Sequence, residues 1–346
     1  MSFVISEGAI CAKVRNLYGK RITEKQFLEL CYKGSLMEIV SFLKSSPLYR
    51  SAFESISESE GNIKLIETTL EKGLLEAYQR LCRFAGSKSM EFFSYFILSN
   101  EITHLAHLVK LMSFSLEGDF FADFPSYFEP YSSLDFNGLY RSSSFDELLK
   151  KLEGTLFYSS LSSIPTDELK RPSYAHCVCM LRKLYHNEIK RSIRASYKGK
   201  MARELLELFE QELELSNLAI IAKIKKQGDE LSPREIKALL CDVNVKISPK
   251  ALDSLISSKS SQELFDQIKK TSYKLEVSSL ASLEIASARY ISSLSKKSVI
   301  YGGNNPALCL SSYLTLRQNE ISNLKAILNG ISKGKSAEEI RSLLIF

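Results

Sequence analysis

The sequence predicts an all-α protein, and three features support this prediction. Proline is absent from the long stretches 48–124, 173–232 and 250–305, which are rich in Leu, Glu, Lys and Ala, residues that helices favour. Apolar residues recur there at steps of three and four, the spacing of one helix face. In the second stretch these residues are Leu205, Leu208, Phe209, Leu213, Leu218 and Ile221. Alternating patterns typical of strands are scarce.

Six predicted helices begin at a Ser or Thr that is followed three residues later by Glu or Gln. In this pattern the hydroxyl caps a free backbone N–H, and the later side chain reaches back to the N–H of the first residue. In chain order the pairs are Thr23/Gln26, Ser35/Glu38, Ser144/Glu147, Ser232/Glu235, Ser260/Glu263 and Ser336/Glu339. The segment 117–141 is the least helical, because it is aromatic, acidic and interrupted by proline.

The composition indicates an intracellular globular protein. The chain has 346 residues, of which 45% are hydrophobic, and a net charge of +6. The seven Cys are odd in number and scattered, and no secretory signal precedes them, so we expect reduced thiols. No apolar run approaches the ~18 residues that cross a bilayer, so we expect no direct membrane span. The mild charge and the lack of a recognisable binding module argue against a nucleic-acid partner.

One helical segment occurs three times. The copies read EITHLAHLVKLM from Glu101, ELSNLAIIAKIK from Glu214 and EISNLKAILNGI from Glu320, and they align without gaps. Each copy begins with Glu, an aliphatic residue, Ser or Thr, a polar residue and Leu. The polar residues at the fourth position are His104, Asn217 and Asn323.

Two further blocks recur with a similar period. A capped block begins at Ser35, Ser144 and Ser260 and ends near a tyrosine in each copy. These tyrosines are Tyr49, Tyr158 and Tyr273. A third block, SPREIKALL and SAEEIRSLL, begins at Ser232 and Ser336.

Because the periods agree, we predict a unit of roughly a hundred residues in three diverged copies. We place the three helical repeats at 1–116, 117–230 and 231–346, with approximate boundaries and with the two termini free to pack together.

The same residues carry a family resemblance. The segments AKVRNLYGKRITEKQFLEL, ELSNLAIIAKIKKQGDELSPREIKALL and RQNEISNLKAILNGISKGKSAEEIRSLLIF resemble the C-type subunits of the V/A-type rotary ATPases (ATP synthases), the counterparts of the d-type subunit of the eukaryotic vacuolar enzyme. The most specific part is the last one, in which NEI-x-NL-(R/K) precedes (G/S)-x-x-x-EIR-x-L. The resemblance spans nearly the whole chain and is weakest at 117–200.

The resemblance implies a fold, a role and partners. It implies three similar helical domains that form a funnel with pseudo-threefold symmetry. It further implies a non-catalytic central-stalk subunit that couples the central shaft subunits (D/F type) to the membrane rotor ring (K/c type proteolipid) and transmits torque for ion transport or ATP synthesis. The protein would then lie peripherally on the cytoplasmic face of the membrane. For contacts with these partners we select Arg15, Tyr18, Glu320 and Asn323 from the recognisable segments.

The residues show no catalytic, cofactor or metal site. The C-terminal GISKGKS has three residues between its glycines where a phosphate-binding loop needs four, and it follows a helix pattern, so we interpret it as a turn between helices. We expect no metal at His176, Cys177, Cys179 and His186, because a second ligand pair is missing nearby. No nucleophile with a neighbouring base is recognisable.

The repeated polar residues leave alternatives open. We favour structural roles for Glu101, His104, Glu214 and Asn217, with the fourth-position side chain fixing its helix by a hydrogen bond. The repeated glutamates could instead line a central mouth, or lie at helix starts facing solvent. Considered without the resemblance, the sequence also fits a cytosolic helical-repeat scaffold unrelated to a rotary motor, or an all-α enzyme with a site at its domain junctions.

Overall fold

The predicted all-α class is confirmed. The computed structural model describes residues 2–56, 62–114, 125–227, 231–303 and 305–346. Within these ranges the regular structure is helical, apart from one isolated antiparallel bridge between Thr166 and Pro172. Of the segment predicted to be least helical, 125–141 holds only short elements, and its first part lies outside the described residues.

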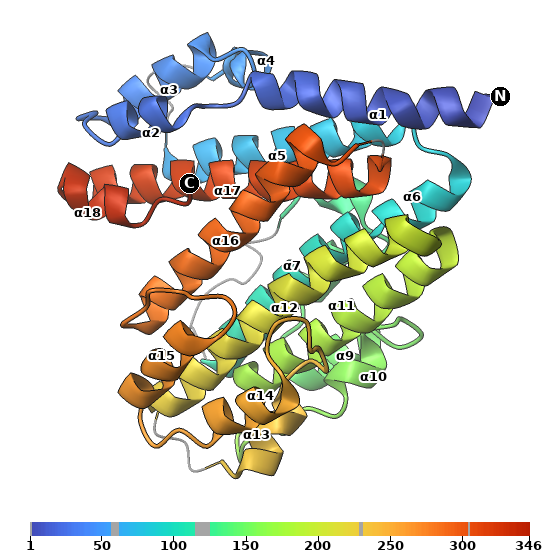
Figure 1. Cartoon of the computed structure of the whole chain (residues 1–346), viewed down its shortest axis with the longest axis vertical. Helices are drawn as coiled ribbons and strands as arrows, with labels where there is room; N and C mark the ends of the chain where they lie inside the picture. The colour runs from blue at the N-terminus through green and yellow to red at the C-terminus, as the bar shows by residue number, and fades with distance from the viewer. Residues whose placement is uncertain (1, 57–61, 115–124, 228–230, 304) are drawn as a thin grey trace. The chain divides into compact units, whose positions relative to one another are not determined.

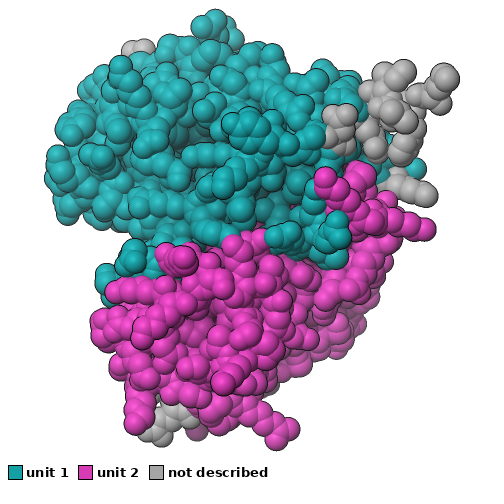
Figure 2. All heavy atoms as spheres, viewed as in Figure 1, with its two compact units in different colours: residues 1–90, 203–208, 275–346 teal, residues 91–202, 209–274 magenta. Residues whose placement is uncertain are grey.

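The chain divides into two compact units (Figures 1 and 2). Unit 1 comprises 1–90, 203–208 and 275–346, and unit 2 comprises 91–202 and 209–274. The helices of unit 1 are α1 (Ser2–Gly19), α2 (Glu24–Leu30), α3 (Leu36–Ser45), α4 (Arg50–Phe53), α5 (Ile63–Cys82), α16 (Leu280–Tyr301), α17 (Pro306–Ser332) and α18 (Ala337–Ser342).

The helices of unit 2 are α7 (Tyr95–Ser113), the 3₁₀ turn η2 (Glu129–Tyr131), α8 (Phe136–Tyr140), α9 (Phe145–Lys151), α10 (Tyr158–Leu161), α11 (Tyr174–Ser196), α13 (Pro233–Leu239), α14 (Pro249–Ile256) and α15 (Ser261–Lys270). Helices α6 (Ser87–Phe93) and α12 (Gly199–Gln227) contribute residues to both units.

Helix α17 is the centre of unit 1. Every residue from Pro306 through Leu314 is buried, as expected for a helix that is covered on all sides. It packs against α1, α5 and α16. Polar contacts fix it further: Lys325 forms an ion pair with Glu71 of α5, and Asn329 Nδ2 donates to Glu67 Oε1 at 3.1 Å. The core of unit 1 is therefore built around a C-terminal helix.

In unit 2, α7 and α11 pack along each other, and an aromatic cluster closes one end of the core. The ring of Phe92 lies 5.1 Å from Tyr95, 5.5 Å from Tyr197 and 6.1 Å from Phe209, measured between centroids. Two of these contacts are edge-to-face, the geometry that aromatic pairs prefer.

All six predicted helix starts are N-caps, in two geometries. Ser232 and Ser336 form complete capping boxes with Glu235 and Glu339, and each cap N–H donates to the glutamate at 2.8 Å. Thr23 forms the same box with Gln26.

The other three caps share a second geometry. In the helices capped by Ser35, Ser144 and Ser260, the glutamate three residues after the cap instead accepts the backbone N–H of the residue before the cap. Copies of the same repeated block thus form the same capping hydrogen bonds. The two kinds of block differ in which backbone N–H the glutamate accepts.

All seven cysteines are buried, and none of them forms a disulfide among the described residues. Burial raises the pKa of Cys82 and of Cys177 to about 12, so both thiols are protonated and poorly nucleophilic. In the described part of the chain, no helix has both the length and the apolar character that a membrane span requires.

The GISKGKS segment is the predicted turn between two helices. Helix α17 ends at Ser332, Gly334 has φ of +63°, and Ser336 caps α18. Gly330, in the last turn of α17, lets α18 approach closely. A Cβ at this position would lie 2.5 Å from Cγ1 of the buried Ile340.

The substitution Gly330→Ala is therefore expected to destabilise unit 1, although alanine is the better helix former. The added methyl group forces Ile340 or α18 to shift, and overpacking of a core costs about 1–3 kcal/mol. Urea unfolding followed by circular dichroism measures the effect. At Gly73, in the interior of α5, a Cβ meets only Ala52 Cβ at 4.0 Å, so Gly73→Ala is the matched control and should be neutral or stabilising. Equal stability of Gly330→Ala and the unmodified chain would contradict the close approach.

Candidate functional site

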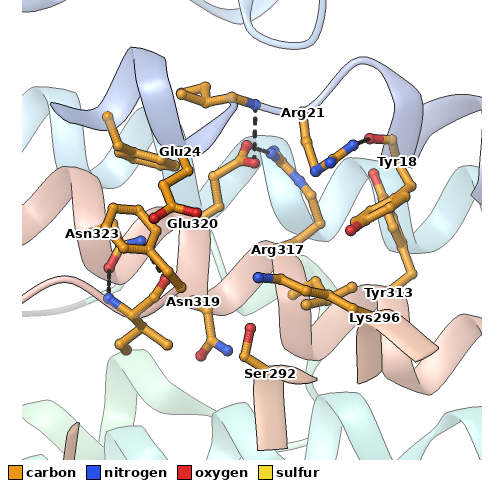
Figure 3. A pocket seen from close by; sticks show the side chains of 15 residues that line it. Tyr18, Arg21, Glu24, Ser292, Lys296, Tyr313, Arg317, Asn319, Glu320 and Asn323 are labelled. Atoms are coloured by element: carbon orange, nitrogen blue, oxygen red, sulfur yellow. Dashed lines mark hydrogen bonds and ion pairs between the residues drawn. The ribbon is translucent and has the colours of Figure 1, made fainter. Parts of the chain in front are cut away.

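Glu320 of α17 is buried and binds two segments from the start of the chain. Its Oε2 accepts the backbone N–H of Ile22 at 3.2 Å, and its Oε1 accepts the hydroxyl of Tyr49 at 2.6 Å. Arg317, one turn earlier, forms an ion pair with the same carboxylate (Figure 3). It also donates to the Tyr49 hydroxyl at 2.7 Å. We call this arrangement, a helix glutamate that holds a backbone N–H and a tyrosine, the glutamate clamp.

Glu214 of α12 forms a second glutamate clamp. Its carboxylate accepts the backbone N–H groups of Val245, Lys246 and Ile247 at 2.9–3.0 Å. The hydroxyl of Tyr273 donates to it at 2.6 Å. Four donors thus surround one buried carboxylate, which compensates for removing its charge from water.

The two clamps use the same positions of the chain. Ile22 and Ile247 each directly precede an N-cap residue, Thr23 of α2 and Ser248 of α14. Tyr49 and Tyr273 are the tyrosines that end the capped block in each copy. The clamp is therefore a tertiary feature of the repeat and is not a coincidence of one helix.

The asparagine one turn after each clamp glutamate pairs with a single backbone residue. Asn217 Nδ2 donates to the carbonyl of Cys241 at 2.9 Å, and the Cys241 N–H donates back to Asn217 Oδ1 at 3.1 Å. Asn323 pairs with Ile345 in the same way, at 2.9 and 2.7 Å. Cys241 and Ile345 follow α13 and α18, which both begin with complete capping boxes. Each asparagine thus fixes the end of a short helix against a long one.

The first copy keeps the position of the clamp and changes its chemistry. Glu101 of α7 accepts the hydroxyl of Ser132 at 2.5 Å, and Ser132 Oγ in turn accepts the N–H of Leu134, which precedes the N-cap of α8. The Ser132 hydroxyl thus links the glutamate to the Leu134 N–H, while the backbone of Ser133 bonds to the glutamate directly. Tyr158, the tyrosine of this copy, is 37% exposed.

His104 stands where the other copies have asparagine, and its ring lies among aromatic side chains. The centroid distances are 5.0 Å to Phe128, 5.7 Å to Phe136 and 6.2 Å to Tyr127. All three glutamates lie within long helices and are at most 6% exposed. The interpretation of these residues as solvent-facing helix starts is therefore wrong, because their carboxylates satisfy buried donors.

In the clamp of Glu320, both the Tyr49 hydroxyl and the Arg317 guanidinium stay protonated. Burial raises the pKa of Tyr49 well above its ordinary value, so its hydroxyl remains a neutral donor. Burial also disfavours the charge of Arg317, but Tyr49 and Glu320 outweigh this effect and the pKa of the guanidinium lies above its ordinary value. Its Cζ lies 4.7 Å from the centroid of the Tyr49 ring, which adds a cation–π contact.

Three of the four residues selected for partner contact meet at one small pocket of unit 1. The pocket has a volume of about 150 Å³, and Tyr18, Glu320 and Asn323 line it (Figure 3). Tyr18 is buried beneath Arg21, whose Cζ lies 4.0 Å from its ring centroid. The fourth residue, Arg15, lies elsewhere and donates to the carbonyls of Val299 and Gly303 at the end of α16.

Three residues that line the same pocket each have a buried donor atom that lacks a hydrogen-bond acceptor within the described ranges. Arg317 Nε, Tyr313 Oη and Asn319 Nδ2 are buried and have none among the described residues. Gln211 occupies the position of Arg317 in the second copy, so this group of donors is a property of the third copy and not of the clamp in general.

The residues considered as metal ligands do not form a metal site. Cys177, Cys179 and His186 are buried, and His176 Nδ1 pairs with the Ser173 hydroxyl at 2.9 Å. Burial lowers the pKa of His186, so its imidazole is neutral at physiological pH. Within the described ranges, no three His, Cys, Asp or Glu side chains are placed to hold a metal ion together.

Comparison with known proteins identifies the family. The family model described as ATP synthase (C/AC39) subunit matches residues 10–343. The chain belongs to the ATP synthase (C/AC39) subunit family. Among similar proteins, the C subunit of the A-type ATP synthase of Pyrococcus furiosus is 21% identical over 344 residues, which cover 96% of this chain and 88% of that protein. The corresponding protein of Methanocaldococcus jannaschii is 23% identical over 349 residues, which cover 96% of this chain and 85% of that protein.

The resemblance noted in the sequence is thereby confirmed. As a member of the C/AC39 family, the chain is a V/A-type ATPase subunit and a non-catalytic one.

Several clamp residues of this C/AC39 protein are not recognisable from the sequence. Tyr49 and Tyr273 are visible as the ends of a repeated block, but nothing local indicates that their hydroxyls bind a glutamate far along the chain. Arg317 does carry a signal, because it lies three residues before Glu320 and therefore on the same helix face. The backbone partners Cys241 and Ile345 carry no side-chain signal at all.

We expect Glu214→Gln to destabilise unit 2 by about 3 kcal/mol, because one acceptor oxygen becomes an NH₂ group that faces buried donors. Urea unfolding at neutral pH measures the change. The control is Glu276→Gln, which makes the same substitution at an exposed position. If both variants unfolded at the same urea concentration, the clamp would contribute no stability.

The first copy should respond to pH. Burial raises the pKa of Glu101, and the bonds from Ser132 and Ser133 only partly oppose this. The pKa of this carboxyl is higher in the folded chain than in the unfolded chain. Its stabilising contribution to folding is therefore complete below the unfolded-state pKa and is lost as the pH rises through the folded-state pKa. The stability of the native chain relative to Glu101→Gln should therefore fall as the pH rises from about 4, the ordinary pKa of a glutamate carboxyl. Urea titrations from this pH upward test it, and a difference that does not change with pH would refute it.

Proposed function

We propose that this C/AC39 protein is the central-stalk part that couples the shaft of a V/A-type ATPase to its membrane rotor ring. It would transmit torque for ion transport or ATP synthesis from a peripheral position on the cytoplasmic face of the membrane. Its partners would be the D/F-type shaft subunits and the K/c-type proteolipids of the ring. The names of its relatives, which are C subunits of A-type ATP synthases, support membership of such a complex.

The glutamate clamp is the observation that carries this proposal. A coupling part needs stiffness and no reaction centre. A buried carboxylate that holds backbone N–H groups and a tyrosine resists local opening, because each hydrogen bond to a charged group contributes about 1.5–3 kcal/mol. In this proposal three similar helical domains, centred on Glu101, Glu214 and Glu320, form a funnel around a pseudo-threefold axis.

The domain limits in this proposal stay near 1–116, 117–230 and 231–346, with one refinement. Since Ile22 and Tyr49 bind Glu320, we assign the N-terminal helices α2 and α3 to the third domain. Each domain would then consist of a long helix followed by its short capped helices.

For partner contacts we retain Arg15, Tyr18, Glu320 and Asn323 as the proposed region. Glu320 and Asn323 are nearly inaccessible, so in this proposal they hold the pocket in shape. Arg15 is exposed, so in this proposal it is the residue of the four that a partner contacts directly.

Deleting residues 336–346 tests the proposal in the assembled ATPase. The deletion removes Ile345, which Asn323 holds, and Phe346, whose ring lies 6.1 Å from that of Phe27 in α2. We expect ATP hydrolysis to continue while the ions moved per ATP fall by more than half. Parallel assays of ATP hydrolysis and of ion uptake into vesicles measure this ratio.

Two further variants make the result decisive. Glu338→Ala changes an exposed residue of the same helix and should leave coupling intact. Asn323→Leu removes the pairing with Ile345 without shortening the chain, and it replaces the deletion if the shortened chain fails to assemble. Normal pumping by complexes that contain either disruptive variant would refute the coupling role, as would failure of the native chain to co-purify with shaft and ring.

A further inference from the structure

A second, larger cleft in unit 1 lies between α1 and α5. Its volume is about 720 Å³, within the range of pockets that bind small organic molecules. One wall runs from Ala12 on α1 to Lys20, directly after that helix, and the other runs from Gly73 on α5 to Phe84, two residues after that helix ends. The residues of each wall follow helical spacing, so each helix presents one face to the cleft.

The cleft is strongly cationic. Lys13 lies on α1 and Lys20 directly follows that helix, while Arg80 lies in the last turn of α5 and Arg83 is the C-cap residue of that helix. All four are exposed. None of the described residues that line the cleft is acidic. Four positive charges around one concavity concentrate anions there.

The floor of the cleft combines apolar surface with one buried cation. Leu17, Leu48 and Leu81 provide the apolar part, and the ring of Phe84 lies 4.3 Å beneath the ammonium of Lys13. Arg317 lines the cleft as well. It is 4% exposed, and its Nε has no acceptor among the described residues.

We propose that this cleft binds an amphiphilic organic anion, a molecule with an apolar body and a phosphate or sulfate-type head group. The body would lie on Leu17, Leu81 and Phe84. The head group would meet the guanidinium groups of Arg80 and Arg83, whose planar donors match phosphate and sulfonate oxygens. This inference does not depend on the coupling role, because the cleft and its charges belong to unit 1 alone.

The same chemistry occurs in free phosphorylated metabolites and in anionic lipids. A free ligand would bind through its head group, whereas a lipid would also need its acyl chain on the apolar floor. Competition between suitable probes separates these two sources.

The test is a fluorescence titration of the full chain with 1-anilinonaphthalene-8-sulfonate, which has an aromatic body and a sulfonate. We expect saturable binding to one site, weakened by salt. The double variant Arg80→Gln/Arg83→Gln should lose at least tenfold in affinity. Gly73→Leu should lose a similar factor by occupying the floor without changing the charge, since a Cβ there meets only Ala52 Cβ at 4.0 Å.

The matched control is Arg234→Gln/Lys250→Gln, which removes two exposed cations from unit 2. It should keep the native affinity within twofold, and all variants should keep the native urea midpoint. Displacement of the probe by inorganic pyrophosphate supports a free phosphorylated ligand. Displacement only by dihexanoyl phosphatidic acid supports a lipid. The proposal is overturned if the native chain shows no saturable binding, if either cleft variant binds as the native chain does, or if neither competitor displaces the probe.

Discussion

A buried glutamate carboxylate, held by donors from distant segments, organises the packing of this chain. Glu214 and Glu320 are each removed from water and surrounded by such donors. Losing such a carboxylate leaves several donors unsatisfied at once, which is far more costly than losing one exposed hydrogen bond. The clamps therefore specify which short helices pack on which long helix, in addition to any stability that they add.

The two clamps differ in where along the chain their partners lie. Glu214 binds residues that follow it by 31 to 59 positions. Glu320 has only 26 residues after it, so its equivalent partners, Ile22 and Tyr49, come from the start of the chain. Segments from near both ends of the chain thus contact α17 in unit 1. In Figure 1 the blue α2 and the red C-terminal end lie side by side, and the contact of Phe27 with Phe346 agrees with this.

Divergence among the copies follows a physical logic. In the first copy the Ser132 hydroxyl bridges Glu101 and the backbone, and an aromatic cage around His104 takes the place of the asparagine pair. In the third copy Arg317 adds a cation and stands at both concavities of unit 1. Such changes keep the packing of the unit and alter what its surface can bind. They fit a family of non-catalytic subunits.

The order of residues alone was enough to establish the helical class, the six capped helix starts and the register of the three repeated helices, because these depend on local spacing and on hydrogen bonds within one turn. It also identified the family, since the motifs near both ends of the chain are specific enough to be recognised. The folded chain was needed to show that Tyr49 belongs with Glu320, that Ile345 pairs with Asn323, and that Arg80 faces the same cleft as Lys13. A buried carboxylate or a backbone amide forms hydrogen bonds with whichever group lies nearby in the folded chain. These partners can be hundreds of residues away in the sequence, and no local pattern marks them.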